Sequence, residues 1–291
     1  MKTAKLAKSY RIDDGKHFRL KDFDPADTGH WHSVENAREA LQEGILRMAE
    51  LQDKLYAQNC WSLLLIFQAL DAAGKDGTIK HVMSGVNPEG CEVYSFKTPS
   101  TTELQHDFLW RTTLRLPERG HIGIFNRSYY EEVLVVRVHP KVLEAEKLPP
   151  SLLTKNIWEE RFEDIRSFER HLARNGTVIR KFLLHVSKKE QKRRFLARLE
   201  EPEKNWKFSA ADIHEREYWD DYQKAYEDMI RNTATKHAPW YVIPADNKWF
   251  THLAVSAAIV ETLEELDLSY PKVDAAKRKE LQASRQLLLK K

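Results

Sequence analysis

The fold is decided by residues 61–78, which read WSLLLIFQALDAAGKDGT. An apolar run from Trp61 to Phe67 leads into a loop containing Gly74 and Lys75, and a segment of helical composition follows. This order is typical of a phosphate-binding loop, in which backbone N–H groups at a helix N-terminus surround phosphate oxygens. Gly74 would let the backbone approach the ligand closely, and Lys75 would add a mobile positive charge.

The match to the motif G-x-x-x-x-G-K-[ST] is incomplete, because Ala69 stands at the first glycine and Asp76 replaces the magnesium-binding hydroxyl. The alternative is a strand-to-helix turn that needs glycine for backbone reasons alone. We favour phosphate binding because the chain has only 10 glycines, yet two of them flank a lysine. The residues expected to contact phosphate are Ala72, Ala73, Gly74, Lys75, Asp76, Gly77 and Thr78, with Asp71 just upstream.

Four more short runs of strand-forming residues follow, at 92–96, 121–125, 177–186 and 240–243. Segments of helical composition separate them, so the sequence predicts an α/β fold with five parallel strands. Ligands of such sheets bind at the carboxyl ends of the strands. The Lys75 loop and the segments after Phe125 and Ile243 should therefore converge.

Flanking segments complete a single expected domain over residues 1–291. Residues 1–30 are polar and rich in turn signals, which predicts an extended arm on the surface. Ser33 is expected to cap a core-packing helix that runs to about Tyr56, so the arm and helix together span about 1–56.

Composition limits the class of protein. With 42% hydrophobic residues and a net charge of +3, the chain can bury a core, and its bulk charge does not favour nucleic-acid binding. The two cysteines, Cys60 and Cys91, lack disulfide or metal-site spacing, which favours a reducing cytoplasm. No apolar stretch is long enough for a membrane span, and the N-terminus lacks a signal-peptide core.

A strongly basic segment lies between the fourth and fifth expected strands. Ser187 and Glu190 have the spacing of a capping box, and the helix they begin carries Lys188, Lys189, Lys192, Arg193, Arg194 and Arg198. Such a run is often only a solvated face, but here it projects from the ligand edge of the sheet, which suits a closing lid over about 187–232. A stripe of Trp219, Tyr222, Tyr226 and Met229 on the second helix of this segment predicts core packing.

The segment after Phe125 reads NRSYYEE and begins with Asn126 and Arg127. Phosphate-loop enzymes usually place an aspartate at this strand end to hold the metal. Because an amide is a neutral ligand, we expect Asp71, Asp76, Glu131 or Glu132 to supply the negative charge for Mg²⁺. Arg127 suits bidentate phosphate binding, with a salt bridge to a neighbouring helix as the alternative.

Four ordered segments together resemble the family-2 polyphosphate kinases over roughly residues 30–268. They are Asp71–Gly77, Asn126–Ser128, the segment from Arg193 through Trp206 and Lys207, and 238–248. The resemblance implies a three-layer α/β/α kinase fold with a helical lid, Mg²⁺ (or Mn²⁺), and reversible phosphoryl transfer between inorganic polyphosphate and nucleotides. It implies metal binding by Asp71, phosphate binding by Lys75 and Arg127, and contacts to polyphosphate or the transition state from Arg193, Arg194 and Arg198. Arg111 is similar to a family arginine on the nucleotide side, and Lys207 lies in the matching lid segment.

Asn126, in place of the commoner aspartate, resembles the subgroup that accepts both nucleoside mono- and diphosphates. We therefore expect AMP and ADP as acceptors, with GMP and GDP as further candidates, ATP as a product, and a homo-oligomeric enzyme. Two alternatives stay open: an ATP-dependent nucleoside monophosphate kinase, and a non-catalytic nucleotide- or RNA-binding module. Acidic residues at the site and the lack of exposed interleaved aromatics argue against RNA.

Overall fold

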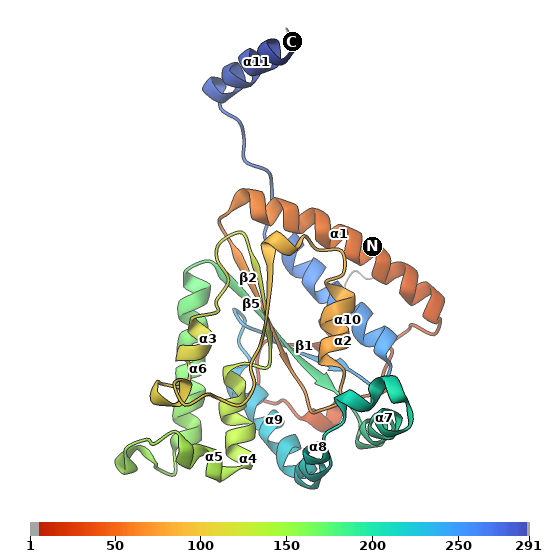
Figure 1. Ribbon diagram of the computed structural model, residues 1–291, viewed down its shortest axis with the longest axis vertical. Coiled ribbons are helices and arrows are strands. Elements are labelled where there is room, and N and C mark those ends of the chain that lie inside the picture. Colours follow the sequence, from red (N-terminus) through yellow and green to blue (C-terminus); the bar gives the residue numbers. More distant parts are fainter. Residues whose placement is uncertain (1–5, 290–291) are drawn as a thin grey trace.

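The computed structural model describes residues 6–289 and contains a six-stranded sheet between two layers of helices (Figure 1). The strand order is β1-β6-β5-β2-β4-β3. The strands are β1 (Arg11–Ile12), β2 (Ser62–Gln68), β3 (Cys91–Ser95), β4 (Ile122–Asn126), β5 (Thr177–His185) and β6 (Trp240–Pro244). Strands β3, β4, β2, β5 and β6 pair in parallel, which confirms the predicted parallel α/β sheet.

The sixth strand was not predicted and comes from the N-terminal arm. Strand β1 pairs antiparallel with β6, with Arg11 opposite Tyr241. The arm is also more buried than a surface segment, because Tyr10 packs in one core cluster while Phe18 and Leu20 pack in the other. The five-stranded prediction is corrected to six because the arm covers the edge of β6, whose backbone groups would otherwise lack partners.

One helical layer consists of α1 (Val34–Gln58), α2 (Lys75–Val82) and α10 (Lys248–Glu264). Ser33 caps α1 as predicted, since its hydroxyl accepts a hydrogen bond from the N–H of Asn36. Helices α1 and α10 pack along each other, and Met48 and Phe250 are fully buried beneath them. Packing within this layer fixes the position of α2. It therefore also fixes the end of the loop that precedes Lys75.

The opposite layer contains α4 (Val135–Val138), α6 (Ile157–Arg174) and α9 (Trp219–Thr233). The aromatic stripe of α9 is buried, with Tyr222, Tyr226 and Met229 in this core cluster and Trp219 in the other, which confirms the packing prediction. The expected lid segment therefore divides: α7 (Lys188–Glu200) and α8 (Ala210–Glu215) precede α9, and α9 itself belongs to the core layer. Its burial follows from the helical spacing of its apolar side chains.

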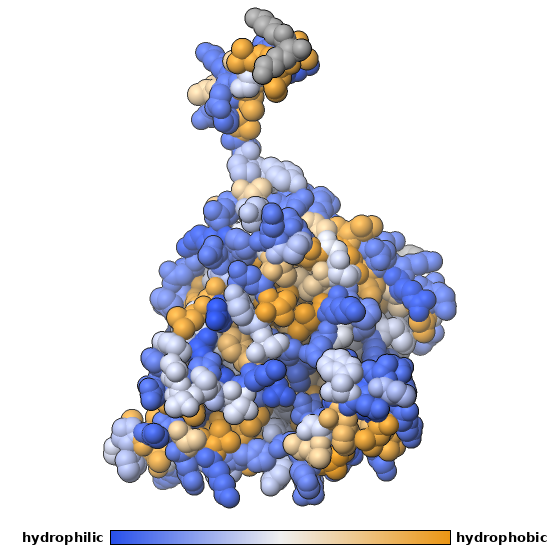
Figure 2. Space-filling model, in the orientation of Figure 1, coloured by the Kyte–Doolittle hydropathy of each residue, from blue (hydrophilic) through white to orange (hydrophobic). Residues whose placement is uncertain are grey.

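The remaining helices are short or peripheral. They are α3 (Trp110–Thr113), α5 (Pro140–Ala145), α11 (Ala275–Leu289) and the 3-10 helices η1 (Leu6–Tyr10), η2 (Leu20–Asp22), η3 (Pro88–Gly90), η4 (Glu103–Gln105), η5 (Tyr129–Val133), η6 (Pro150–Leu152), η7 (Pro202–Lys207) and η8 (Arg216–Tyr218). Helix α11 stands away from the body on an extended segment, and its exposed leucines are visible on the surface (Figures 1 and 2). Within residues 6–289 no helix is both long and apolar enough to cross a membrane.

Candidate active site

The loop between β2 and α2 has the strand–loop–helix form that the sequence predicts. Strand β2 is buried along its whole length, and α2 begins at Lys75. Gly74 precedes the helix with φ 109°, a left-handed conformation that side chains disfavour, which explains glycine at this position. Ala72 also has a positive φ of 62°, so the loop holds local backbone strain next to the helix N-terminus.

Lys75 lies inside the loop. Its Nζ donates a hydrogen bond to the carbonyl oxygen of Ala69 at 2.6 Å and lies 3.4 Å from that of Leu70. The residue is only 9% exposed, and burial lowers the pKa of its ammonium group, while the nearby Asp71 carboxylate opposes this shift. An anion entering the loop would therefore meet a poorly solvated cation, whose electrostatic attraction is stronger than that of a surface lysine.

A cleft of about 1010 Å³ lies over the loop, at the carboxyl ends of the strands. The loop, the end of β4, helix α7, η7 and the start of α10 all line it. Among the described residues, nine lysines and arginines but only four carboxylates line the cleft. This excess of positive charge favours a polyanionic ligand over a nucleotide alone.

Arg127 follows β4 and turns its guanidinium toward the loop. Its NH2 donates to Asp71 Oδ1 at 2.9 Å, and its NH1 lies 3.8 Å from Glu131 Oε2. Arg127 has a φ of 64°, an uncommon backbone conformation for a non-glycine residue that sits at a candidate site. Arg127 thus forms salt bridges both to the loop and to the short helix η5, and it also lines the cleft, where phosphate can compete for its guanidinium.

Asn126, the last residue of β4, is joined to the first turn of α2. Its Nδ2 donates to Asp76 Oδ1 at 2.7 Å. The register of β2 and β4 places Asn126 beside Phe67, so the two strand ends bring the loop and the amide together. Asp71, Asp76 and Asn126 accordingly meet in the cleft, as the sequence predicts for the ligand edge.

The two glutamates of η5 lie deeper. Glu131 accepts a hydrogen bond at 2.7 Å from Gln68, when that amide is oriented to satisfy its neighbours, and burial raises the pKa of the Glu131 carboxyl. Glu132 lies 3.8 Å from Arg111 and 3.4 Å from Arg161, and burial, with a contribution from Glu146, raises its pKa to about 7. Neither glutamate lines the main cleft, but Glu131 is linked to Asp71 through Arg127, which contacts both carboxylates, whereas Glu132 lies beside Arg111 and Arg161.

Glu131, Glu132 and Arg111 instead line a second cavity of about 130 Å³. Apolar residues form much of its wall, including Phe96, Leu104, Phe108, Val135 and Val136. The two cavities share Phe96, Lys97, Thr98 and Arg127 as lining residues. Arg127 therefore stands at the junction of a polar, basic cleft and a smaller cavity whose wall combines apolar and charged side chains.

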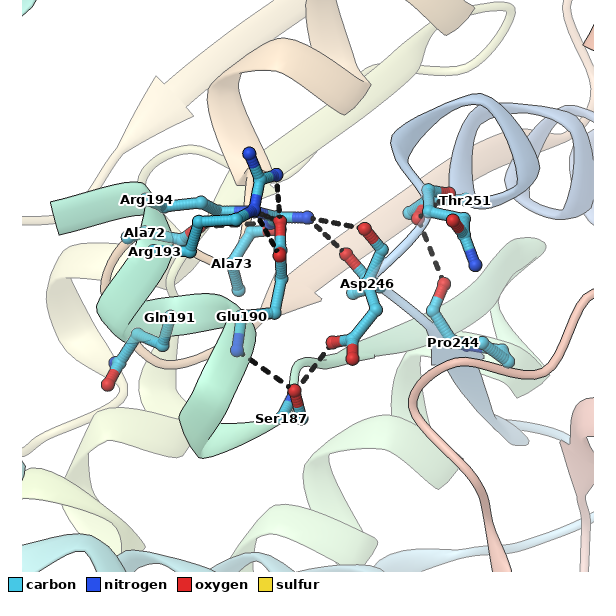
Figure 3. Close-up of polar contacts among 12 residues, drawn as sticks. Ala72, Ala73, Ser187, Glu190, Gln191, Arg193, Arg194, Pro244, Asp246 and Thr251 are labelled. Atoms are coloured by element: carbon cyan, nitrogen blue, oxygen red, sulfur yellow. Dashed lines mark hydrogen bonds and ion pairs between the residues drawn. The ribbon is translucent and has the colours of Figure 1, made fainter. Parts of the chain in front are cut away.

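Arg194 on α7 spans the loop and the segment after β6 (Figure 3). Its NH1 donates to the carbonyl oxygens of Ala72 at 3.0 Å and Ala73 at 2.6 Å. Its NH2 donates to those of Ala245 at 2.5 Å and Asp246 at 3.1 Å. With a buried guanidinium that contacts four main-chain carbonyls, Arg194 is placed to hold the shape of the loop.

Arg193 and Arg194 share Glu190 as a partner. Arg193 contacts it through two hydrogen bonds of 2.7 and 2.6 Å, and Arg194 through one of 2.7 Å. Although partial burial opposes the effect, these bonds lower the pKa of Glu190. The Ser187 hydroxyl caps α7 as predicted, but the capping box is not reciprocal, because the Ser187 N–H donates to Asp246 and the Glu190 carboxylate is used by the arginines.

Arg193, Arg198 and Lys207 line the same cleft, whereas Lys188, Lys189 and Lys192 of the predicted basic run do not. Arg198 donates to Asp212 Oδ2 at 3.1 Å and to the carbonyl oxygen of Lys207 at 3.2 Å. Lys207 lies over the ring of Trp206, with its Nζ 5.0 Å from the ring centroid. In contrast to Arg194, the Arg193 side chain is 69% exposed, which leaves it freer to move toward a ligand.

Sequence reasoning missed several cleft residues: Lys97, Lys204, Lys248, His81 and His252. Lys97 and Lys248 follow strands β3 and β6, so their place at the ligand edge was accessible from the strand pattern. The two histidines gave no such signal, since they lie on helices α2 and α10, which meet only in the folded chain.

The donor set around the loop suits Mg²⁺. Within the described part of the chain, no three histidine, cysteine, aspartate or glutamate side chains converge into a metal cage. Magnesium commonly needs only one or two carboxylates in addition to substrate phosphates and water. Asp71 and Asp76 meet that requirement beside Lys75, and Asn126 adjoins them.

A phosphate-binding loop on a parallel sheet, arginines at the strand ends and a basic helical cover define a phosphotransferase of the α/β phosphate-loop class. A sequence model of the Polyphosphate kinase 2 family matches residues 31–271. The chain belongs to this family, as the motifs of the sequence indicate.

Individual relatives agree with that assignment. An ADP-polyphosphate phosphotransferase from Rhodopseudomonas palustris is 56% identical over 284 residues, which cover 94% of this chain and 98% of the relative. An AMP/ADP-polyphosphate phosphotransferase from Meiothermus ruber is 46% identical over 273 residues, with the same two coverages. A crystal structure of polyphosphate kinase 2 from Arthrobacter aurescens TC1 superimposes with a TM-score of 0.88 at 39% identity, covering 98% of this chain and 96% of that one.

Proposed function

We propose that this enzyme transfers phosphoryl groups reversibly between inorganic polyphosphate and nucleoside mono- and diphosphates, with Mg²⁺ as the cofactor. The relatives from R. palustris and M. ruber, an ADP-polyphosphate and an AMP/ADP-polyphosphate phosphotransferase, support the substrate pair. The observation that carries the proposal for this chain is the junction at Arg127 between the two cavities. The basic cleft suits a polyphosphate chain, and the second cavity, which is smaller than a typical ligand pocket, would take part of the nucleoside of the acceptor.

The transfer needs little acid–base chemistry, because the attacking phosphate oxygen of the acceptor is already anionic. The difficulty is to bring two polyanions together, so positioning and charge neutralisation supply most of the catalysis. Lys75 and the backbone N–H groups at the start of α2 bind the phosphate to be transferred. Arg127, at the junction, orients the acceptor phosphate, and Arg111 neutralises charge on the nucleoside side.

Asp71 and Asp76, with Asn126 beside them, would hold Mg²⁺, which supplies charge neutralisation to the phosphates when bound. The Asp71–Arg127 salt bridge of 2.9 Å keeps both side chains at the loop until ligand enters. Arg194 keeps the loop in shape through its main-chain contacts, and the exposed Arg193 is the lid residue best able to reach the transferring group.

We further propose that AMP and ADP both serve as acceptors and that the enzyme is a homo-oligomer. Because Asn126 is neutral where an aspartate is commoner, the strand end nearest the acceptor carries one negative charge fewer. Repulsion of the acceptor is therefore weaker, and the phosphate of AMP or of ADP can occupy more than one position there. Glu131 and Glu132 both line the second cavity, where they would face the nucleoside, and Glu131 also contacts Arg127.

The test is an assay of polyphosphate and Mg²⁺ with AMP, ADP, GMP or GDP, with products separated by chromatography. Formation of ATP from both AMP and ADP is expected. Phosphorylation of ADP but never AMP, at saturating Mg²⁺ and polyphosphate, would refute the acceptor range alone. Turnover with ATP as the donor and none with polyphosphate would select the alternative, an ATP-dependent nucleoside monophosphate kinase.

A further inference from the structure

Two stacked histidines line the cleft at a distance from the phosphate-binding loop. The rings of His81 on α2 and His252 on α10 have centroids 4.5 Å apart and planes inclined by 18°. Both line the main cleft together with Lys248 and Thr251. His81 is six residues beyond Lys75, or ~9 Å of helix at ~1.5 Å per residue, so a ligand that reaches both must be extended.

Gly77 leaves the space between Lys75 and the histidines open. A Cβ at this position would meet no atom within 4 Å, and the backbone is not in the left-handed region. Neither crowding nor backbone conformation therefore requires glycine here, although glycine is a poor helix former, by ~1 kcal/mol relative to alanine. A bare backbone facing the cleft is what the close passage of a ligand requires.

A hydrogen bond fixes the proton of His81. Its Nδ1 lies 2.8 Å from the carbonyl oxygen of Gly77, which can only accept, so Nδ1 carries the hydrogen. In the neutral ring Nε2 is then an acceptor, and it cannot donate to a phosphate oxygen. Binding of phosphate at this edge therefore requires a second proton on the ring.

The surrounding charges oppose a proton on the neighbouring His252 ring when no anion is bound. Burial, His81 and Lys248 together lower the pKa of His252 to about 4. Arg193, Arg194 and Lys204 face Lys248 from α7 and η7, and Glu190 is the nearby carboxylate. A polyanion in the cleft would compensate these positive charges and stabilise a protonated histidine pair.

We propose that His81, His252 and Lys248, with the exposed backbone of Gly77, form a subsite for the inner phosphates of a long polyphosphate chain. The subsite takes up a proton when the chain binds. It distinguishes longer chains from the shortest ones, because a donor of only two or three phosphates that occupies the Lys75 loop does not span the ~9 Å to the histidines. This inference rests on the proposed use of polyphosphate and adds the residues that select chain length.

The test compares a long-chain polyphosphate fraction with a short fraction of two or three phosphates, using ADP and excess Mg²⁺. In the double variant His81→Phe/His252→Phe the stacked rings are kept and their polar edges removed. We expect KM for the long fraction to rise about tenfold, the effect of losing one charge-assisted hydrogen bond. KM for the short fraction and kcat with either fraction should be unchanged. Lys248→Met should also raise KM for the long fraction and leave KM for the short fraction unchanged.

The pH profile separates recognition from a structural effect. In the wild type, the preference for the long fraction should increase as pH falls toward about 4, the pKa of His252 without a bound anion, because above that pH only the complex holds the extra proton. The double variant should lack this increase, whereas His171→Gln, an exposed control on α6, should retain it.

Equal losses with both fractions, or an unchanged pH profile in the double variant, would overturn the subsite. If the wild type used neither fraction, the proposed function itself would fail, and this inference with it.

Discussion

The guanidinium of Arg194 donates a 2.6 Å hydrogen bond to the carbonyl oxygen of Ala73, which ties helix α7 to the phosphate-binding loop. The same side chain reaches Ala245 at 2.5 Å, so one residue connects the lid helix, the loop and the end of β6. Such a residue sets the shape of the loop before any ligand binds. Substitution of an arginine that holds the loop in place should lower stability as well as rate, whereas substitution of one that contacts the transferring phosphoryl group should lower the rate alone.

Arg194→Lys should lower the free energy of unfolding by roughly 1–3 kcal/mol, because one ammonium group cannot satisfy carbonyls on two sides and leaves buried acceptors unpaired. The maximal rate should also fall as the loop loses its shape. Thermal denaturation and steady-state kinetics measure both effects.

Arg193→Lys is the matched comparison, since Arg193 is exposed and its ion pair with Glu190 adds little stability. Its unfolding free energy should stay within ~0.5 kcal/mol of the wild type, while kcat falls if the guanidinium contacts the transition state. Equal stability losses in both variants would contradict the division of roles.

Lys75→Met should leave the fold intact and reduce kcat by ~10² or more, because methionine fills a similar volume without the charge that stabilises the transferring group. Turnover by chromatography and the circular dichroism spectrum give the two readouts. A folded variant that keeps a third of the normal rate would refute the assignment of the loop.

Asp71→Asn should raise the Mg²⁺ concentration needed for half-maximal rate and lower the maximal rate, since it removes one carboxylate from the expected metal ligands. Magnesium titrations at saturating substrates measure this. Asp53→Asn, at an exposed position on α1, is the control. If both variants titrate like the wild type, Asp71 does not hold the metal.

Asn126→Asp should shift the preference between AMP and ADP, because it restores a negative charge next to Asp76 and breaks the 2.7 Å hydrogen bond between them. The ratio of kcat/KM for the two acceptors is the measurement. An unchanged ratio would show that the residue at the end of β4 does not set the acceptor range.

Glu132→Gln should flatten the pH dependence of stability. The folded pKa of Glu132 is raised to about 7 from 4.5, so the folded state binds more protons than the unfolded state between these values. Its contribution to the free energy of unfolding is therefore largest below pH 4.5 and falls as pH rises toward 7, by on the order of 1–3 kcal/mol.

Denaturant unfolding across this pH range should show the fall in the wild type and in the exposed control Glu144→Gln, but not in Glu132→Gln. Parallel curves for all three proteins would place the titrating group elsewhere.

The sequence by itself determined the parallel sheet, the phosphate-binding loop and the ligand edge. These features depend on local patterns: an apolar run, a glycine before a lysine, and the periodicity of the following helix. The segments after β2 and β4 were placed together because parallel strands end at the same edge, and the 2.9 Å contact between Asp71 and Arg127, 56 residues apart, agrees with that reasoning. The resemblance of the ordered motifs gave the family.

Only the tertiary structure decided how the individual side chains are used. Arg193 and Arg194 are adjacent and chemically identical, yet one is exposed and the other is buried against main-chain carbonyls, because α7 turns only one of them toward the loop. Glu131 and Glu132 follow the strand end but face the second cavity, and the N-terminal arm adds a strand that its polar composition concealed. These outcomes depend on packing between elements far apart in the chain, and local sequence patterns carry no record of that packing.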